Sequence, residues 1–148
     1  MKINDSNIKK AVKYLNNHEC IGIPTETVYG LAANAYSDKA TKRIFKLKGR
    51  PADNPLIVHY YNIKDLEKDC KTNTLFYKLY NSLCPGPITF ILKLKNKSKI
   101  SKNVTNNKKT LGVRFPNHRV ATVLLKSLKY PLAAPSANIS KGISPVTK

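Results

Sequence analysis

Two neighbouring cations, Lys48 and Arg50, have the residue types that bind phosphate groups. Lysine offers a compact positive charge, whereas arginine presents a planar set of donors that can bind two oxygens at once. Both follow a predicted helix, and the flanking Gly49 and Pro51 would hold the backbone in a fixed turn, so both side chains can reach one cleft. This arrangement fits a polyphosphate. The simpler alternative is that both cations stabilise the C-terminal end of the helix dipole and otherwise face water.

Three other polar clusters come directly after predicted strands, in residues 24–30, 113–118 and 135–138. Loops at strand ends are where α/β sheets bind ligands. In the last cluster, Ser136 and Asn138 can offer a hydroxyl and an amide to a phosphate or to the edge of a nucleobase. An ordinary turn stabilised by these two side chains is the alternative.

Several common kinds of catalytic site have no motif in this sequence. There is no G-x-S-x-G nucleophile elbow, no G-x-x-x-x-G-K-S/T loop and no G-x-G-x-x-G loop, so a bound ATP would need a less common set of loops. His59 lies in an apolar run, where a packing role is the commoner one, and no second His or Cys stands at metal-ligand spacing. Cys20, Cys70 and Cys84 are widely spaced and odd in number, so neither a disulfide framework nor a zinc site is predicted.

The elements that must position these clusters follow from the apolar periodicity. A helix with a cap at Asp5 or Ser6 should end near residue 16. A second helix, with a cap at Ser37 or Asp38, should turn Ala40, Ile44, Phe45 and Leu47 inward. Further helices are predicted over residues 75–83 and 117–128, and strands over 20–23, 56–60, 88–94, 111–115 and 132–134. Residues 25–30 and 95–109 are expected to be loops. Because strands alternate with helices, the class is α/β with a mixed twisted sheet, in one domain.

The charge is strongly positive and unevenly distributed. The formal net charge is +19, and all eight acidic residues lie between Asp5 and Asp69. Such a balance indicates an anionic partner, which could be a nucleotide phosphate, a nucleic acid or a membrane surface. A compositional bias towards Lys and Asn is the alternative. Because no apolar run is long enough for a membrane span or a signal peptide, a soluble cytoplasmic protein is predicted.

Taken together, these clusters resemble the YrdC/TsaC family. The segments IPTETVYGLAANA, IFKLKGRPADNPLIVHY, CPGPITFIL, GVRFPNH and PLAAPSANIS stand in the family's order and at about its spacing, from Ile21 onward. The resemblance implies an open twisted mixed sheet with flanking helices and a concave basic face. It also implies a nucleotidyltransferase that condenses L-threonine, bicarbonate and ATP to threonylcarbamoyl-AMP and pyrophosphate. A downstream complex would then transfer the threonylcarbamoyl group to a tRNA adenosine.

The resemblance assigns roles to residues of this chain. Lys48 and Arg50 are expected to be catalytic and, with Ser136 and Asn138, to bind ATP. The residues expected on the threonine side are Thr27, His59 and Arg114. A carbamate that attacks a triphosphate brings two anions together, so catalysis should come from charge neutralisation and positioning, with Mg²⁺ on the leaving pyrophosphate and no metal held by the protein alone.

The sequence also departs from the family pattern. Ala32 and Lys141 stand where the family usually has glycine, and family members continue past the segment that matches Ser144 and Pro145. Residues 1–148 are therefore expected to form a single YrdC-like domain without the usual C-terminal strands. Two other interpretations stay open: a module that binds tRNA or double-stranded RNA with the same basic concavity, and an inactive truncated fragment.

Overall fold

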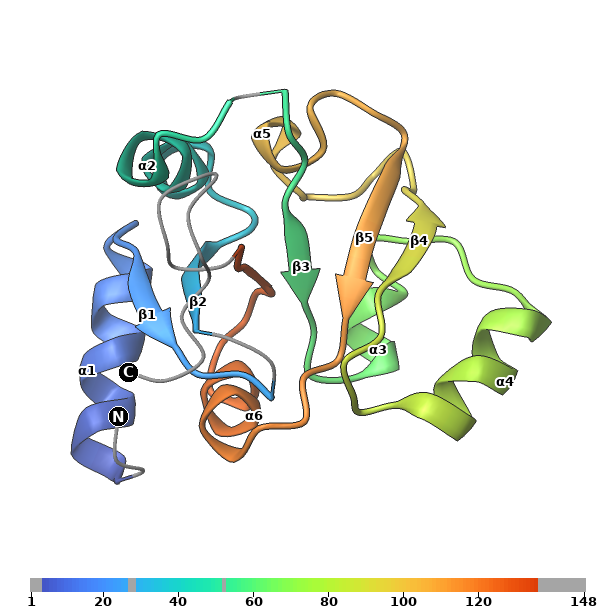
Figure 1. Cartoon of the computed structure of the whole chain (residues 1–148), viewed down its shortest axis with the longest axis horizontal. Helices are drawn as coiled ribbons and strands as arrows, with labels where there is room; N and C mark the ends of the chain where they lie inside the picture. The colour runs from blue at the N-terminus through green and yellow to red at the C-terminus, as the bar shows by residue number, and fades with distance from the viewer. Residues whose placement is uncertain (1–3, 27–28, 52, 136–148) are drawn as a thin grey trace.

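The described part of the computed structural model comprises residues 4–26, 29–51 and 53–135, which form one mixed sheet with helices on both sides (Figure 1). The strand order is β1-β2-β6-β3-β5-β4. The pair β3 and β5 is parallel, and every other neighbouring pair is antiparallel. The strands are β1 (Ile21–Ile23), β2 (Gly30–Asn34), β3 (Ile57–His59), β4 (Phe90–Lys93), β5 (Thr110–Arg114) and β6 (Leu132–Ala133). The predicted α/β class is confirmed.

Local signals account for where the helices begin. The side chain of Asn4 accepts a hydrogen bond from Asn7 N at 2.8 Å, so α1 is capped one residue before the predicted Asp5. Ser37 caps the second helix as predicted, with Ala40 N donating to its Oγ at 3.0 Å. The helices are α1 (Asp5–Asn16), α2 (Asp38–Lys48), α3 (Ile63–Leu66), α4 (Thr74–Leu83), α5 (Lys102–Thr105) and α6 (Arg119–Lys126). Within the described ranges, none of them has the length and apolar character needed to cross a bilayer.

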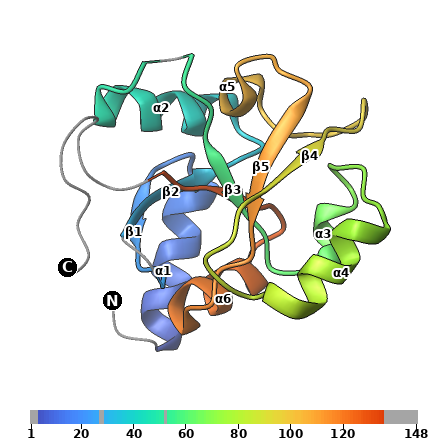
Figure 2. The same cartoon turned by 45° about the vertical axis from the view of Figure 1, so that its right-hand side comes forward.

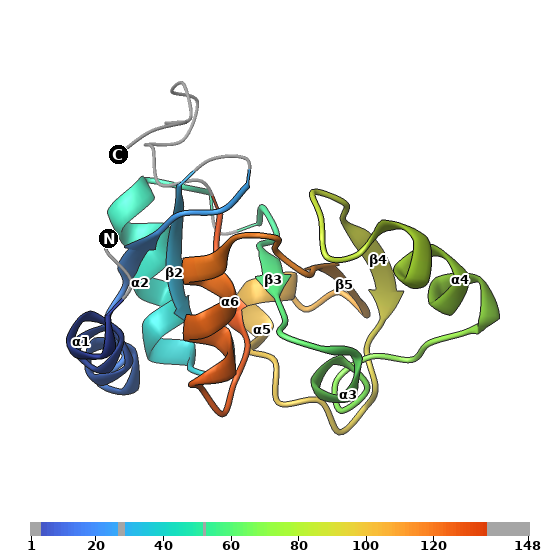
Figure 3. The same ribbon diagram turned by 90° about the horizontal axis from the view of Figure 1, so that it is seen from below.

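Two hydrophobic clusters lie on opposite faces of the sheet, because successive side chains of a strand alternate between its faces. One cluster joins Val58 of β3 and Val113 of β5 to residues of α2, α3, α4 and α5. The other joins Leu132 of β6 to apolar residues of α1 and α6, which lie side by side in Figure 2. Seen from below, α3 and α5 lie on the same side of β3, β4 and β5 (Figure 3).

The structure corrects three expectations about the elements. Gly30 begins a strand, β2, that the polar residues before it did not indicate. Leu47 was expected to face inward but is 62% exposed, because the phase of α2 turns Ile44, Phe45 and Lys48 towards the core. The segment 95–109 was expected to be an exposed connection, yet it contains α5, whose Val104 is fully buried.

Candidate functional site

His59 and Arg114 are paired across the parallel strands β3 and β5. Paired residues on neighbouring strands point to the same face of a sheet. The side chains of Val58 and Val113, one residue earlier on each strand, enter the large core. His59 and Arg114 therefore lie on the other face, away from α3 and α5, and the predicted threonine-side residues His59 and Arg114 do come together.

The guanidinium of Arg114 is held by Thr89, which precedes β4. Nε and Nη2 of Arg114 donate to Thr89 Oγ1 at 3.3 and 2.9 Å. Arg114 remains partly exposed, so its remaining donors are available to a ligand. This contact was not foreseen from the sequence, although Thr89 lies in the segment CPGPITFIL that carried part of the resemblance.

His59 is a buried imidazole that is neutral at physiological pH. It is 3% exposed. Its pKa is lowered to about 4, mainly by burial and also by the positive charge of Arg114, while a hydrogen bond to the backbone of Ala134 acts in the opposite direction. Among the described residues, Nδ1 of His59 is buried and has no hydrogen-bond partner. A neutral ring that donates from its other nitrogen can therefore accept a hydrogen bond at Nδ1.

The surface between these two residues and the strand edge is apolar and open. Ile91 of β4 is 68% exposed. A methyl group added at Gly112 would meet Ile91 Cδ1 at 3.5 Å, Thr89 Cγ2 at 3.6 Å and Ile57 Cγ1 at 3.7 Å, so these side chains surround the glycine. In Figure 1 the strands β3, β5 and β4 face the viewer, and no described helix lies in front of them. A ligand held by Arg114 could lie on this apolar surface around Gly112.

Lys48 and Arg50 lie where α2 ends. Gly49 adopts a left-handed conformation with φ of 61°, and Arg50 N donates to Phe45 O at 3.1 Å, which closes the helix. Nε and Nη2 of Arg50 donate to the carbonyls of Asn54 and Pro55 at 3.3 and 2.8 Å. Arg50 thus ties the end of α2 to the chain that enters β3.

Lys48 is only 2% exposed, on the same side of α2 as the core residues. Burial lowers its pKa, and the neighbouring charge of Arg50 lowers it further. Burial also lowers the pKa of Arg50. The fold therefore holds two cations close together in a place that disfavours their charge, and an anion bound there would relieve this cost.

These two cations and the His59–Arg114 pair lie towards opposite ends of β3. Arg50 contacts the carbonyl of Pro55, four residues before His59. Four residues of extended chain span at most about 14 Å. The structure thus places a pair of cations at the entry of β3 and a third cation beside a neutral imidazole at its exit.

Glu26 joins two of the segments that carried the resemblance. Its Oε2 accepts a hydrogen bond from Asn117 N at 2.7 Å, across 91 residues of sequence. Its Oε1 is buried and, among the described residues, has no hydrogen-bond partner. Glu26 belongs to the polar cluster of residues 24–30, but a single glutamate in a loop carries no spacing signal that predicts this contact.

Three residues expected in the site, Thr27, Ser136 and Asn138, lie outside the described residues. Two described residues that precede Ser136, namely Ala134 and Pro135, form backbone hydrogen bonds with the sheet. Pro135 O accepts a hydrogen bond from Leu31 N at 2.8 Å, and Ala134 N donates to Ile57 O at 3.0 Å. The segment that leads to Ser136 therefore passes between β2 and β3.

Several known proteins resemble this chain in sequence and in fold. The chain is 41% identical to the threonylcarbamoyl-AMP synthase of Bacillus subtilis (strain 168), a match that covers 98% of this chain and 42% of that protein. It is 32% identical to the putative threonylcarbamoyl-AMP synthase of Methanocaldococcus jannaschii, of which it covers 69%. The solved structure of P. abyssi Sua5 complexed with L-threonine superposes with a TM-score of 0.91 at 40% identity, covering 98% of this chain and 42% of that one.

The chain thus spans about two fifths of the length of the Bacillus subtilis relative and of P. abyssi Sua5. The model of the Sua5/YciO/YrdC family, described as telomere recombination, matches residues 13–148. This match covers far more than half of the chain, and the mixed sheet with flanking helices is the one that the resemblance implied. The chain belongs to the Sua5/YciO/YrdC family.

Proposed function

We propose that this chain is an enzyme that makes threonylcarbamoyl-AMP from L-threonine, bicarbonate and ATP. The observation that carries the proposal is the pairing of Arg114, a cation fixed by Thr89, with His59, a neutral buried ring whose Nδ1 can accept a hydrogen bond. Relatives named threonylcarbamoyl-AMP synthase and the P. abyssi Sua5 structure with L-threonine support it.

In this proposal, L-threonine binds on the open face of β3 and β5. Arg114 binds the α-carboxylate through a charge-assisted hydrogen bond. His59 Nδ1 accepts a hydrogen bond from the amine or the hydroxyl of threonine. Because the imidazole is neutral at pH 7, it does not repel a positively charged amine. Thr27 contributes to the same pocket.

ATP binds with its phosphates near the end of α2. Lys48 and Arg50 neutralise the triphosphate, and Ser136 and Asn138 complete the site. Mg²⁺ enters as the ATP complex, bound mainly by phosphate oxygens, as is usual for this ion. The ion would lower the charge of the leaving pyrophosphate.

The reaction needs two bond-forming steps. The threonine nitrogen forms a bond to the carbon of bicarbonate, and water leaves, which gives a carbamate. A carbamate oxygen then forms a bond to the α-phosphorus while the bond to the pyrophosphate oxygen breaks. Threonylcarbamoyl-AMP and pyrophosphate are the products, and a separate transfer complex would carry the threonylcarbamoyl group to tRNA.

The first test is an assay of pyrophosphate release by the purified chain with ATP, Mg²⁺, bicarbonate and L-threonine. We expect pyrophosphate release to require L-threonine. L-serine should support it far less well, because serine lacks the methyl group that would contact the apolar surface around Gly112. Release at the same rate with and without an amino acid would indicate a different reaction. A folded chain that releases no pyrophosphate would remove the proposal.

A further inference from the structure

Two buried side-chain atoms in the described part of the chain have no hydrogen-bond partner, and both are acceptors. One is Nδ1 of His59, and the other is Oε1 of Glu26. A buried acceptor without a donor costs free energy, so native structures seldom contain one without a reason. If the two atoms lie near each other, they indicate a ligand that supplies two donors.

The first link between these two residues is Ala134. The ring of His59 forms a hydrogen bond with the backbone of Ala134. Gly30, at the end of the loop that carries Glu26, lies close to the same residue, since a methyl group added at Gly30 would meet Ala134 Cβ at 3.3 Å. The loop between β1 and β2 therefore ends beside the segment that His59 contacts.

The second link is the end of β5. Oε2 of Glu26 accepts a hydrogen bond from Asn117 N at 2.7 Å, and Asn117 comes three residues after Arg114. Three residues of extended chain span at most about 11 Å. In Figure 1 the chain that leaves β1 runs towards the start of α6, which follows Asn117. Glu26 is thus held near the end of β5 that carries Arg114.

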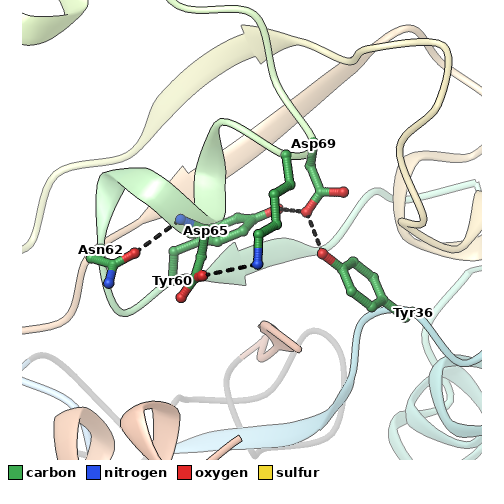
Figure 4. Close-up of polar contacts among 6 residues, drawn as sticks. Tyr36, Tyr60, Asn62, Asp65 and Asp69 are labelled. Atoms are coloured by element: carbon green, nitrogen blue, oxygen red, sulfur yellow. Dashed lines mark hydrogen bonds and ion pairs between the residues drawn. The ribbon is translucent and has the colours of Figure 1, made fainter. Parts of the chain in front are cut away.

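The other carboxylates of the chain lie elsewhere in the fold. Asp38 begins α2, and Asp69 accepts hydrogen bonds from the hydroxyls of Tyr36 and Tyr60 at 2.7 and 2.8 Å (Figure 4), on the side of the sheet that carries α2 and α3. The remaining five lie near the ends of α1, in the loop before β3, and in or directly after α3; they are Asp5, Glu19, Asp53, Asp65 and Glu67. Among the described residues, Glu26 is therefore the carboxylate tied to the end of β5.

We propose that Oε1 of Glu26 binds the α-ammonium group of the amino-acid substrate and accepts its proton, an inference that rests on the synthase reaction proposed above. Threonine has two donor groups, the ammonium and the hydroxyl, and the site has two acceptors without a partner. The carboxylate suits the ammonium, because this hydrogen bond is charge-assisted. The neutral Nδ1 of His59 then accepts from the hydroxyl, while Arg114 binds the carboxylate. The three contacts together select an α-amino acid with a β-hydroxyl group.

The carbamate step needs such a proton acceptor. An ammonium nitrogen has no lone pair, so it cannot attack bicarbonate until it loses a proton. While the nitrogen forms its bond to carbon, it loses two protons in all. One joins the departing hydroxyl and leaves as water, and the other passes to Oε1 of Glu26, which becomes a carboxylic acid. The products are the threonine carbamate and water, and Glu26 later returns its proton to solvent.

A purely structural role for Glu26 would need only Oε2, which ties the loop to the start of α6. The variant Glu26→Gln separates the two roles, because it keeps an oxygen that can accept from Asn117 N but removes the charge and the site of protonation. Glu19→Gln is the matched control. It makes the same substitution just before β1, whereas Glu26 follows the other end of that strand.

The first test is calorimetric titration with L-threonine and with (R)-3-hydroxybutanoate, which is threonine without its amine. The wild type should bind threonine roughly 10- to 100-fold more tightly than the hydroxy acid, since a hydrogen bond between charged groups is lost. Glu26→Gln should lose this preference and bind the hydroxy acid at least as tightly as the wild type does. Glu19→Gln should keep the preference.

Three binding results would overturn the proposal. The first is a wild type that binds both ligands equally, which requires no variant. The second is a Glu26→Gln variant that keeps the wild-type preference for threonine. The third is a Glu26→Gln variant with an unchanged circular-dichroism spectrum that loses both ligands, because the glutamate would then have only a structural role.

The second test measures pyrophosphate release at saturating threonine. At pH 7 the rate of Glu26→Gln should be at least about 100-fold below that of the wild type, as expected for the loss of a general base. The deficit should shrink towards pH 9, where more of the threonine amine is already deprotonated. An equal deficit at both pH values would remove the proton transfer. A wild type that requires threonine and a Glu26→Gln variant of equal activity would remove this inference and leave the synthase proposal standing.

Other titratable or charged side chains around Glu26 do not confuse this comparison. They come from its own loop, from β3 and β5, and from the start of α6: Tyr29, His59, Arg114, His118 and Arg119. Both proteins contain them, so the ratio of the two rates at each pH reports on Glu26.

Discussion

His59 and Arg114 face the same side of the sheet as register partners on β3 and β5, and the positive charge of Arg114 helps to keep the ring of His59 neutral. Arg114 offers charge to an anion, and His59 offers a hydrogen-bond acceptor, Nδ1, for which the described part of the chain supplies no donor. An amino acid presents the complementary groups, a carboxylate next to a nitrogen donor.

Replacing Arg114 with glutamine should weaken L-threonine binding by roughly 10- to 100-fold, because a charged hydrogen bond to the carboxylate contributes about 1.5–3 kcal/mol. The Michaelis constant for threonine in the pyrophosphate assay measures the effect. Arg114→Lys should recover part of the loss, since it keeps the charge but not the planar donor set. Wild-type affinity in Arg114→Gln would contradict the assignment of the carboxylate site.

Thr89 should act as a positioning residue for Arg114. Thr89→Val removes the oxygen that accepts from Nε and Nη2 and keeps the shape of the side chain. We expect a fall of about 5- to 10-fold in kcat/KM for threonine, which corresponds to one hydrogen bond of about 1 kcal/mol. Thr89→Ser should restore the wild-type value. If the valine and serine variants behave alike, the hydroxyl has no role in the site.

His59 should make stability depend on pH. Its pKa in the fold is about 4, below the ordinary value of 6.5, so the unfolded chain binds the proton more readily. Its contribution is fully present above about pH 6.5 and is lost as the pH falls towards 4, which amounts to about 3 kcal/mol. Urea unfolding of the wild type and of His59→Asn between pH 4.5 and 7.5 measures the difference. Parallel curves for the two proteins would show that His59 does not titrate in this way.

Lys48→Met should lower ATP affinity by roughly 10- to 100-fold, because it removes one of the two cations that would neutralise the triphosphate. Equilibrium binding of ATP measures the effect. The control is Lys46→Met, which removes an exposed lysine from the last turn of the same helix. Equal ATP affinities in the two variants would place the phosphates elsewhere.

Asp69→Asn should destabilise the fold by about 2–4 kcal/mol, because a buried acceptor of several hydrogen bonds is replaced by a group that must also donate. The burial of Tyr60 and the neighbouring Asp69 raise the pKa of the Tyr60 hydroxyl, so this hydroxyl stays a donor. Tyr60→Phe should therefore cost about 1 kcal/mol. Urea unfolding measures the stability of both variants. If Asp69→Asn lowers the free energy of unfolding by less than about 0.5 kcal/mol, the carboxylate has no structural role.

Much of the fold could be predicted from periodicity and capping residues. Ser37 begins α2 as expected, and the apolar runs that contain Val58 and Val113 are strands. The strand β2 was missed because Gly30 and a run of alanines have weak strand propensity. The space at Gly30 is tight, since a methyl group there would lie 3.3 Å from Ala134 Cβ and 3.4 Å from Pro135 O.

The sequence predicts residue types for the candidate site, but it does not predict the contacts between them. The pairing of His59 with Arg114 depends on the strand register, and the role of Thr89 depends on a contact across 25 residues. No local sequence pattern specifies the strand register or the contact between Thr89 and Arg114. The inward direction of Lys48 follows from the helix phase set by Ile44 and Phe45, and it was missed because lysines are seldom buried.

The most direct measurement supplies the chain with L-threonine, Mg²⁺-ATP and ¹³C-labelled bicarbonate and analyses the products by mass spectrometry. We expect threonylcarbamoyl-AMP that carries one heavy carbon, that requires both threonine and ATP, and that falls sharply in Arg114→Gln. A folded wild-type chain that forms no labelled adenylate, or an Arg114→Gln variant that forms as much as the wild type, would contradict the account.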